Sequence, residues 1–317
     1  MRLALVLAAA LVHLTASAQD WPAKPVRLVV PFPPAGAADA VPRVIAEKLS
    51  EKWKQPFVIE DRAGATGTIG AELVYHAEAD GYTFLATPPA PLVINPALYE
   101  KLPYDPSQFA PVSVIAEIPS VMLVHPKVAA NSVQDFVALA RKNPGRINYA
   151  SQGTTSVSFL TTEWFMSVAG GLKMTQVPYK GTAPGLAALL AGEVELMFDN
   201  LGTSLQHVRA GKLKALAVCG ETRVASLPGV PAMSEIYPGF ISIAWFGVVA
   251  PPRTSSSVTE KLSRGIAEAL EDPEVRERLA RLSAEPMGLG PARMREFMQR
   301  DAARWREAIR IAGLRPQ

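Results

Sequence analysis

Four loops of this chain bring glycine, hydroxyl or charged residues to points where an apolar run gives way to a helical pattern. They cover residues 31–39, 151–156, 179–182 and 199–200. A turn that opens a helix presents unpaired backbone N–H groups and the positive end of the helix dipole, which together attract an anion. Glycine lets the backbone approach such a ligand closely. The loops therefore indicate a carboxylate site, with ordinary helix caps and tight turns as the alternative.

Side chains that carry catalysis or bind metals are sparse. His76, His125 and His207 are not spaced as a metal-binding pair, and none lies near a cysteine. The sequence contains neither a G-x-S-x-G nucleophile turn nor a G-x-x-x-x-G-K-[ST] phosphate loop. The single cysteine, Cys219, lies in the apolar run LKALAVCG and is interpreted as a buried core thiol. We therefore expect a protein without catalytic residues, metal or cofactor.

The elements that position the loops alternate between β-rich runs and helical patterns. Strands are predicted over 26–30, 57–59, 83–86, 112–115, 121–124, 147–150, 175–178, 196–198, 213–218 and 244–249. Helices are predicted over 39–53, 69–77, 132–142, 156–168, 183–190 and 204–210. This alternation favours an α/β fold with largely parallel sheets, in which ligands bind beyond the carboxyl ends of the strands.

The C-terminal part is predicted to be helical. Ser257-Val258-Thr259-Glu260 is typical of a capping box, and Asp272-Pro273 of a cap followed by proline at the first helical position. An apolar stripe then indicates a helix packed on its own domain, with a partner-binding helix as the alternative. The stripe contains Met294, Phe297, Met298, Trp305 and Ile309.

The N-terminus indicates export. Arg2 is followed by an apolar run from Leu3 to Val12, and Ala16-Ser17-Ala18 has the small-x-small pattern of a signal peptidase site. The run is shorter than the roughly 20 apolar residues that a membrane-spanning helix needs. We expect cleavage after Ala18, with residues 1–18 as signal peptide, and a periplasmic location.

Composition indicates a globular protein and argues against a nucleic-acid partner. The chain has 317 residues, of which 49% are hydrophobic and 19% charged, and its formal net charge is +3. These values are typical of a globular protein long enough for two domains. Because no dense run of Lys or Arg is present, nucleic acid is not expected as a partner.

Eight segments carry a resemblance to a known family. They are PFPPAGAAD (31–39), GATGTIGAELV (64–74), DGYTFL (80–85), NPALYEKLPYDP (95–106), VPYKGTAPGLAALLAGEVELMFDN (177–200), GKLKALAV (211–218), LPGVPAMSE (227–235) and WFGVVAPP (245–252). The chain resembles the Bug family of extracytoplasmic solute receptors, the binding proteins of tripartite tricarboxylate transporters. The resemblance extends from about residue 21 to the C-terminus.

The resemblance implies an α/β, two-lobed periplasmic-binding-protein fold of the Venus flytrap, type II-like kind, with a ligand cleft between the lobes. It implies a small carboxylate ligand: a di- or tricarboxylate, an acidic amino acid or an aromatic acid. In lobe 1 the implied ligand-binding residues are Phe32, Ala35, Gly36, Ala37, Asp39, Thr66 and Gly67. In lobe 2 they are Gly153, Thr154, Thr155, Ser156, Tyr179, Lys180, Gly181 and Asp199.

Two of these residues keep a structural alternative, and two loops depart from the family pattern. Asp39 could only cap its helix, and Asp199 could only order the loop after Phe198. The family usually has a second glycine where Ala35 stands, and the loop QGTTSVS lacks the Asn or His often found there. Both departures concern the identity of the ligand rather than the fold.

We expect lobe 1 to comprise 24–117 plus 227–317 and lobe 2 to comprise 118–226, with hinges near 116–121 and 223–227. A monomeric receptor would close over its ligand and be recognised by a membrane permease. One alternative is a sensor subunit that presents the liganded form to a histidine kinase. A second is a secreted α/β hydrolase, for which Ser156 with His207 is the best available pair.

Overall fold

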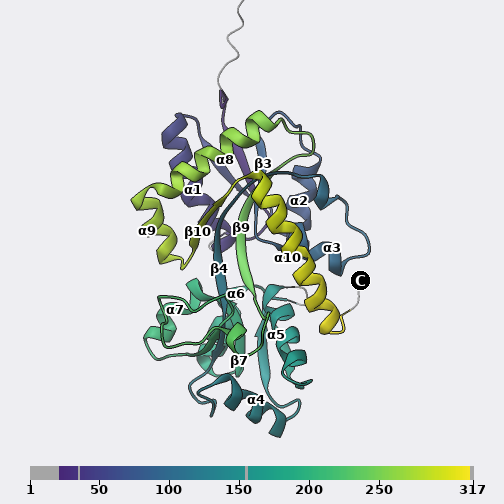
Figure 1. Cartoon of the computed structure of the whole chain (residues 1–317), viewed down its shortest axis with the longest axis vertical. Helices are drawn as coiled ribbons and strands as arrows, with labels where there is room; N and C mark the ends of the chain where they lie inside the picture. The colour runs from purple at the N-terminus through teal and green to yellow at the C-terminus, as the bar shows by residue number, and fades with distance from the viewer. Residues whose placement is uncertain (1–20, 35, 154–155, 315–317) are drawn as a thin grey trace, which may run out of the picture.

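The computed structural model describes residues 21–34, 36–153 and 156–314, and it folds into two lobes stacked along the long axis of the molecule (Figure 1). The expected two-lobed α/β architecture is confirmed. The segment 1–18 and residues Ala35, Thr154 and Thr155 lie outside the described residues. None of the helices in the described part of the chain combines the length and apolarity that a membrane crossing requires.

Lobe 1 is built on a mixed sheet in the order β2-β1-β3-β9-β4, with β10 also paired to β4. Strands β1, β2 and β3 are parallel, whereas β9 and β10 run antiparallel to their neighbours. The strands are β1 (Val26–Val30), β2 (Phe57–Asp61), β3 (Thr83–Thr87), β4 (Ala110–Val124), β9 (Ile243–Ala250) and β10 (Glu285–Leu289). In keeping with a sheet covered by helices on both faces, β9 is buried along its whole length.

Lobe 2 is built on the far end of β4. That end pairs antiparallel with β7 and β8, and β7, β5 and β6 continue the sheet as parallel neighbours. The strands are β5 (Asn148–Ser151), β6 (Thr175–Pro178), β7 (Leu196–Asn200) and β8 (Lys214–Val218). Apolar residues from both lobes form two large buried clusters, one containing Val29 and Phe198 and the other Val30 and Met197. Neighbouring residues in a strand thus supply opposite faces of the sheet.

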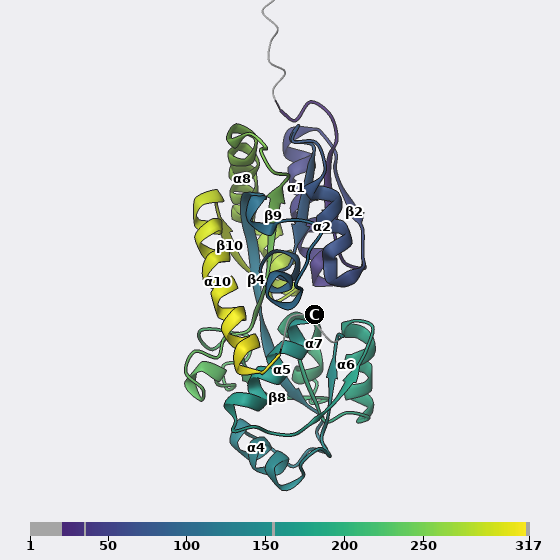
Figure 2. The same ribbon diagram turned by 90° about the vertical axis from the view of Figure 1, so that its right-hand side faces the viewer.

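Helices cover both sheets (Figure 2). In lobe 1 they are α1 (Ala37–Trp53), α2 (Thr68–Tyr75), α3 (Asn95–Leu98), α8 (Ser256–Glu271), α9 (Pro273–Arg281) and α10 (Pro291–Ile311). In lobe 2 they are α4 (Val133–Lys142), α5 (Val157–Val168), α6 (Thr182–Ala191) and α7 (Leu201–Arg209). Short 3₁₀ turns occupy 65–67, 106–108 and 233–235, and a π-helical turn occupies 90–94.

The observed starts of α8 and α9 confirm one predicted helix cap and correct another. The side chain of Asp272 accepts hydrogen bonds from the backbone of Glu274 and Val275, so the predicted cap ahead of Pro273 is confirmed. The predicted capping box at 257–260 is wrong, because α8 begins at Ser256 and its N-cap is Ser255. The four residues of the predicted box therefore lie inside α8, because the pattern starts two residues after the N-cap that the structure shows.

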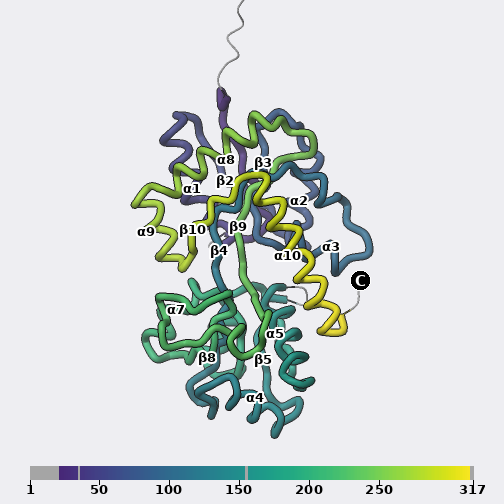
Figure 3. The backbone as a smooth tube through the Cα atoms, viewed as in Figure 1, coloured from purple at the N-terminus to yellow at the C-terminus, as the bar shows by residue number. Residues whose placement is uncertain are grey.

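The strand β4 passes from one lobe to the other without interruption (Figure 3). Residues from Ala110 to Pro119 pair with β9, and residues from Ser120 to Val124 pair with β7. The prediction of two separate strands at 112–115 and 121–124 is therefore wrong. The chain changes partners at the crossing between lobes instead of breaking, so one strand continues from the sheet of lobe 1 into that of lobe 2.

A second segment connects the lobes at Ser242, just ahead of β9, and it is hydrogen-bonded to the first crossing at Ser120. The backbone N–H of Ser120 donates to the carbonyl of Ser242, and that of Ser242 donates to the carbonyl of Cys219. The hydroxyl of Ser242 lies 3.2 Å from that of Ser120 and 2.6 Å from that of Thr161 in α5. Cys219 is fully buried, as expected for a core thiol.

The helix α10 runs from lobe 1 along the crossing to α5 of lobe 2 (Figures 1 and 2). Its buried Asp301 accepts a 2.6 Å hydrogen bond from the indole of Trp245 in β9. Near its end, the carbonyl of Ile311 accepts a hydrogen bond from Ser167 in α5. The predicted apolar stripe packs into the core of this chain, as expected for a helix that packs internally, although α10 packs on both lobes and not only on its own.

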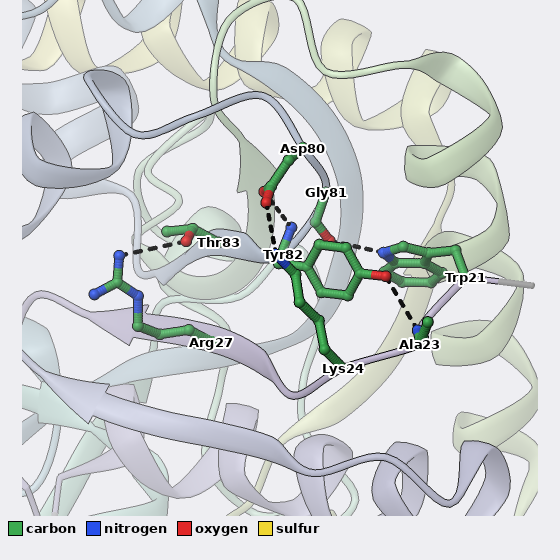
Figure 4. A network of polar contacts seen from close by, with 8 residues as sticks. All are labelled: Trp21, Ala23, Lys24, Arg27, Asp80, Gly81, Tyr82 and Thr83. Carbon is green, nitrogen blue, oxygen red and sulfur yellow. Dashed lines mark hydrogen bonds and ion pairs between the residues drawn. The ribbon is translucent and has the colours of Figure 1, made fainter. Parts of the chain in front are cut away.

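The start of the described chain is fixed to lobe 1 by a small polar network (Figure 4). The indole of Trp21 donates to the carbonyl of Gly81 at 2.8 Å, and the phenol of Tyr82 accepts from the backbone of Ala23 at 3.0 Å. The ammonium group of Lys24 lies 4.3 Å from the centre of the Tyr82 ring and 3.1 Å from a carboxylate oxygen of Asp80. The segment 80–82 therefore anchors the chain just ahead of β1.

Candidate functional site

The register of the sheets places the carboxyl ends of the parallel strands from both lobes at the crossing. Thr87 at the end of β3 pairs with Gly247 of β9. Because the two strands are antiparallel, β3 runs toward Ile243, where β9 begins beside the crossing. Asn200 at the end of β7 pairs with Ser120, which lies at the crossing itself. Strands β1 and β2 run with β3, and β5 and β6 run with β7. The loops that follow these strands therefore face each other from opposite lobes.

The loop from β1 to α1 supplies the first group of expected residues. Gly36 is the N-cap of α1, and its carbonyl accepts from the backbone of Asp39 and Ala40. Among the described residues no side chain caps this helix, and a Cβ built at Gly36 would meet only open space. Phe32 and Ala37 are half-buried. The first turn of α1 is thus open to a ligand.

Asp39 forms an ion pair with an arginine of its own helix. It is buried, and its Oδ1 accepts 3.1 Å and 2.6 Å hydrogen bonds from Nε and Nη2 of Arg43. Arg43 also lies 4.0 Å from Asp61 at the end of β2. Burial and the nearby Asp39 charge raise the pKa of Asp61. The pair Asp39–Arg43 therefore links the start of α1 to the end of β2.

The loop before α2 contains consecutive residues with left-handed backbone. The φ angles are +45° at Ala65, +52° at Thr66 and +86° at Gly67. A Cβ at Gly67 would lie 2.7 Å from Cγ of Pro91 and 3.1 Å from Cε2 of Phe32. The structure thus brings the expected residues Phe32 and Gly67 into contact, and only glycine fits at position 67 without displacing a neighbour.

The loop from β5 to α5 is ordered by hydroxyl groups. Ser156 is the N-cap of α5, accepting from the backbone of Phe159 at 3.2 Å and donating to the carbonyl of Gly153 at 3.0 Å. Its hydroxyl lies 3.0 Å from that of Ser158, which accepts from the backbone of Gln152. Gly153 has a φ of +113°. The expected contact Ser156 is therefore also the residue that shapes its own loop.

Asp199 lies at the centre of a buried network that joins the loops of lobe 2. Its Oδ1 accepts from Nε2 of Gln152 at 2.9 Å, and its Oδ2 accepts from the hydroxyl of Thr203 at 2.5 Å. The same Gln152 amide donates to Thr182 at the start of α6. Asp199 is only 2% exposed, and burial raises its pKa to about 6 against the opposing hydrogen bonds. Its contacts match the alternative of a carboxylate that orders the loop after Phe198.

The loop from β6 to α6 holds the remaining expected residues. Tyr179 is half-buried, and its backbone donates to the carbonyl of Ser151 at 2.8 Å. Lys180 is exposed, and Gly181 is the N-cap of α6 with a φ of +106°. In the described residues neither α6 nor α7 has a side-chain cap on its N-terminus. Two helix N-termini of lobe 2 thus lie beside the loop ordered by Ser156.

The two lobes touch where α7 meets the end of α9. A Cβ at Gly202, in the first turn of α7, would overlap the carbonyl oxygen of Leu282 and lie 2.8 Å from its carbonyl carbon. The C-terminal end of α9 thereby faces the N-terminal part of α7, an arrangement that helix dipoles favour. This approach of backbone to backbone is available only to glycine.

A pocket of about 260 Å³ lies between α1 and α9, beside the expected ligand residue Asp39, whose partner Arg43 is part of its lining. It is lined by Ala40, Arg43, Val44, Arg278, Arg281 and Leu282. Each of its arginines is paired with a carboxylate: Arg43 with Asp39, Arg278 with Glu47 and Arg281 with Glu277. The pocket therefore presents charges that already neutralise each other.

The serine and histidine considered for a hydrolase belong to different helices. Ser156 caps α5, and His207 lies in the last turn of α7. Within the described ranges no hydrogen bond joins them, and the hydroxyl of Ser156 is engaged by its own loop. The described part of the chain also contains no group of three or more His, Cys, Asp or Glu arranged to hold a metal ion.

Sequence reasoning missed several residues that organise the site. Gln152, Thr182 and Thr203 surround Asp199, and Asn95 contacts the left-handed loop at Thr66. Gln152 and Thr182 lie within the loops that the sequence identified as candidate sites. The sequence did not indicate that they bond to each other or that Gln152 bonds to Asp199. The sequence indicated a role for Asn95 only through its position in the segment NPALY, which is one of those that carry the family resemblance.

The chain is similar to known proteins over nearly its whole length. Residues 41–314 match the protein family described as "Tripartite tricarboxylate transporter family receptor". A relative, Protein BugT of Bordetella pertussis, is 36% identical over 300 residues, which cover 94% of this chain and 92% of that protein.

Two solved structures resemble this one closely. R. palustris Rpa4515 with adipate has a TM-score of 0.87 at 37% identity, and the match covers 94% of this chain and 100% of that chain. MatC (Rpa3494) from Rhodopseudomonas palustris with bound malate has a TM-score of 0.82 at 31% identity, covering 91% and 99%. Both similarities extend across the two lobes.

Proposed function

The chain belongs to the tripartite tricarboxylate transporter receptor family, and we propose that it binds a small carboxylate between its lobes for delivery to a membrane permease. The observation that carries this proposal is the convergence of strand ends from both lobes, followed by helices α1, α6 and α7, which in the described residues lack a side-chain cap. Helix N-termini of this kind bind carboxylates through backbone N–H groups. The adipate and malate in the two similar structures make dicarboxylates the first ligands to test.

In this proposal the protein binds and releases its ligand without chemical change. The loop residues that face the crossing contribute backbone groups and hydroxyls, and the buried Asp199 orders the lobe 2 loops. A carboxylate held by backbone N–H groups from both lobes would favour the closed arrangement, because only that arrangement brings the two sets of groups together.

We place the hinge at the paired crossings of the chain. The first crossing is in β4 near Pro119 and Ser120, within the range expected from the sequence. For the second we favour Ser242 over the expected range 223–227. The residues ahead of it pack on lobe 2, since the ring of Phe240 stacks on Trp164 with centroids 4.3 Å apart. Lobe 2 would then extend to about residue 242.

We also propose export to the periplasm with cleavage after Ala18. The anchored Trp21 supports this site, because removal of 1–18 would leave every contact of the network in Figure 4 intact. Sequencing the N-terminus of the protein purified from a periplasmic extract tests the proposal. A mature N-terminus other than Gln19 would contradict it.

The ligand proposal is tested by thermal unfolding of residues 19–317 with a panel of carboxylates, after the protein has been unfolded and refolded to remove bound ligand. The panel should include adipate, malate, citrate, glutamate and benzoate, with the matching amides as controls. A ligand at 100 times its Kd stabilises the folded state by about 2.7 kcal/mol. We expect a shift with at least one carboxylate and none with its amide; no shift with any acid would overturn the proposal.

A further inference from the structure

The loop of lobe 1 that holds Thr66 and Gly67 needs an external support. Ala65 and Thr66 are L-residues with φ of +45° and +52°, a left-handed conformation that is unfavourable for residues other than glycine. The loop's own hydrogen bonds run from the backbone of Gly67 to Gly64 and from that of Thr68 to Ala65. Two short-range bonds close the turn, and a contact from outside is required to favour it over extended alternatives.

Asn95 supplies this support from within the core. Its Nδ2 donates to the carbonyl of Thr66 at 3.2 Å and lies 3.3 Å from the hydroxyl of Thr68. The donor therefore spans both sides of Gly67. Asn95 is fully buried, and it directly follows the π-helical turn 90–94. Such turns are rare and are often found at functional sites.

The turn that carries Asn95 is itself fixed to the loop. Pro91 lies against Gly67, where an added Cβ would be 2.7 Å from its Cγ. The carbonyl of Pro91 accepts a 2.9 Å hydrogen bond from the buried phenol of Tyr104. Burial raises the pKa of Tyr104 to about 12, so this phenol stays a donor at any physiological pH. Asn95 and Pro91 thus form a rigid backing for the left-handed loop.

The amide of Asn95 is used as a donor only. Its Oδ1 has no hydrogen-bond partner among the described residues, although it is buried. A buried acceptor without a partner reduces stability, so an apolar residue of the same size would suit this position better if packing were its only role. The requirement for two N–H donors to the loop explains an amide here.

We propose that Asn95 is a positioning residue for ligand binding: it fixes the left-handed turn that presents Thr66 and Gly67 beside Phe32. This inference rests on the proposed carboxylate-binding function. Asn95 acts through the loop and touches no ligand. Loss of its donors would release the turn while leaving the helix N-termini of lobe 2 unchanged.

Hydrogen exchange and ligand affinity test this inference with Asn95→Leu, which keeps the branching and the number of side-chain heavy atoms but removes the donors. Because the backbone N–H groups of Gly67 and Thr68 are bonded within the loop, their exchange reports directly on the turn. We expect faster exchange at these two positions and an affinity about tenfold weaker for the carboxylate that stabilises the wild type. Asn95→Ala, which removes the donors without adding volume, should change both properties in the same direction.

Asn143→Ala is the matched control. Asn143 also donates from Nδ2 to a backbone carbonyl, that of Leu139 at 2.9 Å, but it caps α4 in lobe 2. It should change neither the exchange at 67–68 nor the affinity. Unchanged exchange in Asn95→Leu, or in Asn95→Ala if the first variant does not fold, would overturn the positioning role. If the wild type binds no carboxylate, the proposed function fails, and the exchange measurement still decides whether Asn95 holds the turn.

Discussion

The two lobes prepare their halves of the candidate site by different physical means. In lobe 1 the loop at 64–67 is shaped by steric contact, with Gly67 fitted between Phe32 and Pro91 and supported by the neutral amide of Asn95. In lobe 2 the loops are joined by hydrogen bonds to one buried carboxylate, that of Asp199. One half therefore depends on shape and the other on charge.

This difference predicts different sensitivities. Steric fit in lobe 1 does not change with protonation, so that half should fail when volume is added. A carboxylate buried in lobe 2 carries a raised pKa, so that half should respond to pH within the range where Asp199 titrates. Variants that add volume or remove charge can separate the two halves.

The largest effect is expected from Gly67→Val in lobe 1. The side chain would require left-handed backbone at a β-branched residue and would overlap Pro91 and Phe32. We expect the free energy of unfolding to fall by about 3 kcal/mol, measured by urea denaturation. Gly229→Val is the control, because in the described structure a Cβ at that exposed glycine meets nothing within 4 Å. Equal losses in the two variants would contradict the steric account of lobe 1.

The next effect concerns Asp199→Asn and pH. Because burial raises the pKa of Asp199 to about 6, the folded state binds a proton more tightly than the unfolded state. Its contribution to stability is fully present below its unfolded pKa near 4 and is lost as pH rises through about 6. The stability of the wild type relative to Asp199→Asn should therefore fall by about 2 kcal/mol between pH 4 and pH 7, measured by urea denaturation at each pH.

Glu235→Gln provides the control of opposite sign. Arg223 holds the pKa of Glu235 down at about 2, so this carboxylate stabilises the fold above its unfolded pKa and loses its effect as pH falls toward 2. The side chains of Arg223 and Glu235 are both exposed, so the effect should be small. A pH dependence of Asp199→Asn that matched that of Glu235→Gln would show that the buried network does not govern lobe 2.

The smallest effect on stability is expected where the lobes meet, at Gly202→Ala. Alanine suits a helix better than glycine, but its Cβ would overlap the carbonyl of Leu282 and prevent the observed approach of the lobes. We expect nearly unchanged stability, a larger radius of gyration in X-ray scattering and an affinity about tenfold lower for any ligand held by both lobes. Gly229→Ala should change none of these. Unaltered scattering and affinity in Gly202→Ala would mean that this contact is not needed for closure.

Much of the local structure was predictable because it depends on neighbours in sequence. The run VRLVV and the amphipathic stretch after Asp39 have the periods of a strand and a helix, and both elements form. The strand β10 was missed because its segment EPMGL contains proline and glycine and no β-branched residue. Its pairing with β4 compensates for that weak preference.

By itself the sequence determined the α/β class, the order of most strands and helices, the loops that follow the strands and the family resemblance, because each depends on periodicity or on motifs along the chain. Only the tertiary structure decided that β4 continues through both lobes, that Asp199 points into a network with Gln152 and Thr203, and that Asn95 reaches Thr66. Those features depend on which side chains meet after distant segments pack. The contact of Asp199 with Thr203 is local, four residues along the chain. Gln152 is 47 residues from Asp199 and Asn95 is 29 residues from Thr66, so these partners meet only when the sheets and core assemble, and no local pattern encodes them.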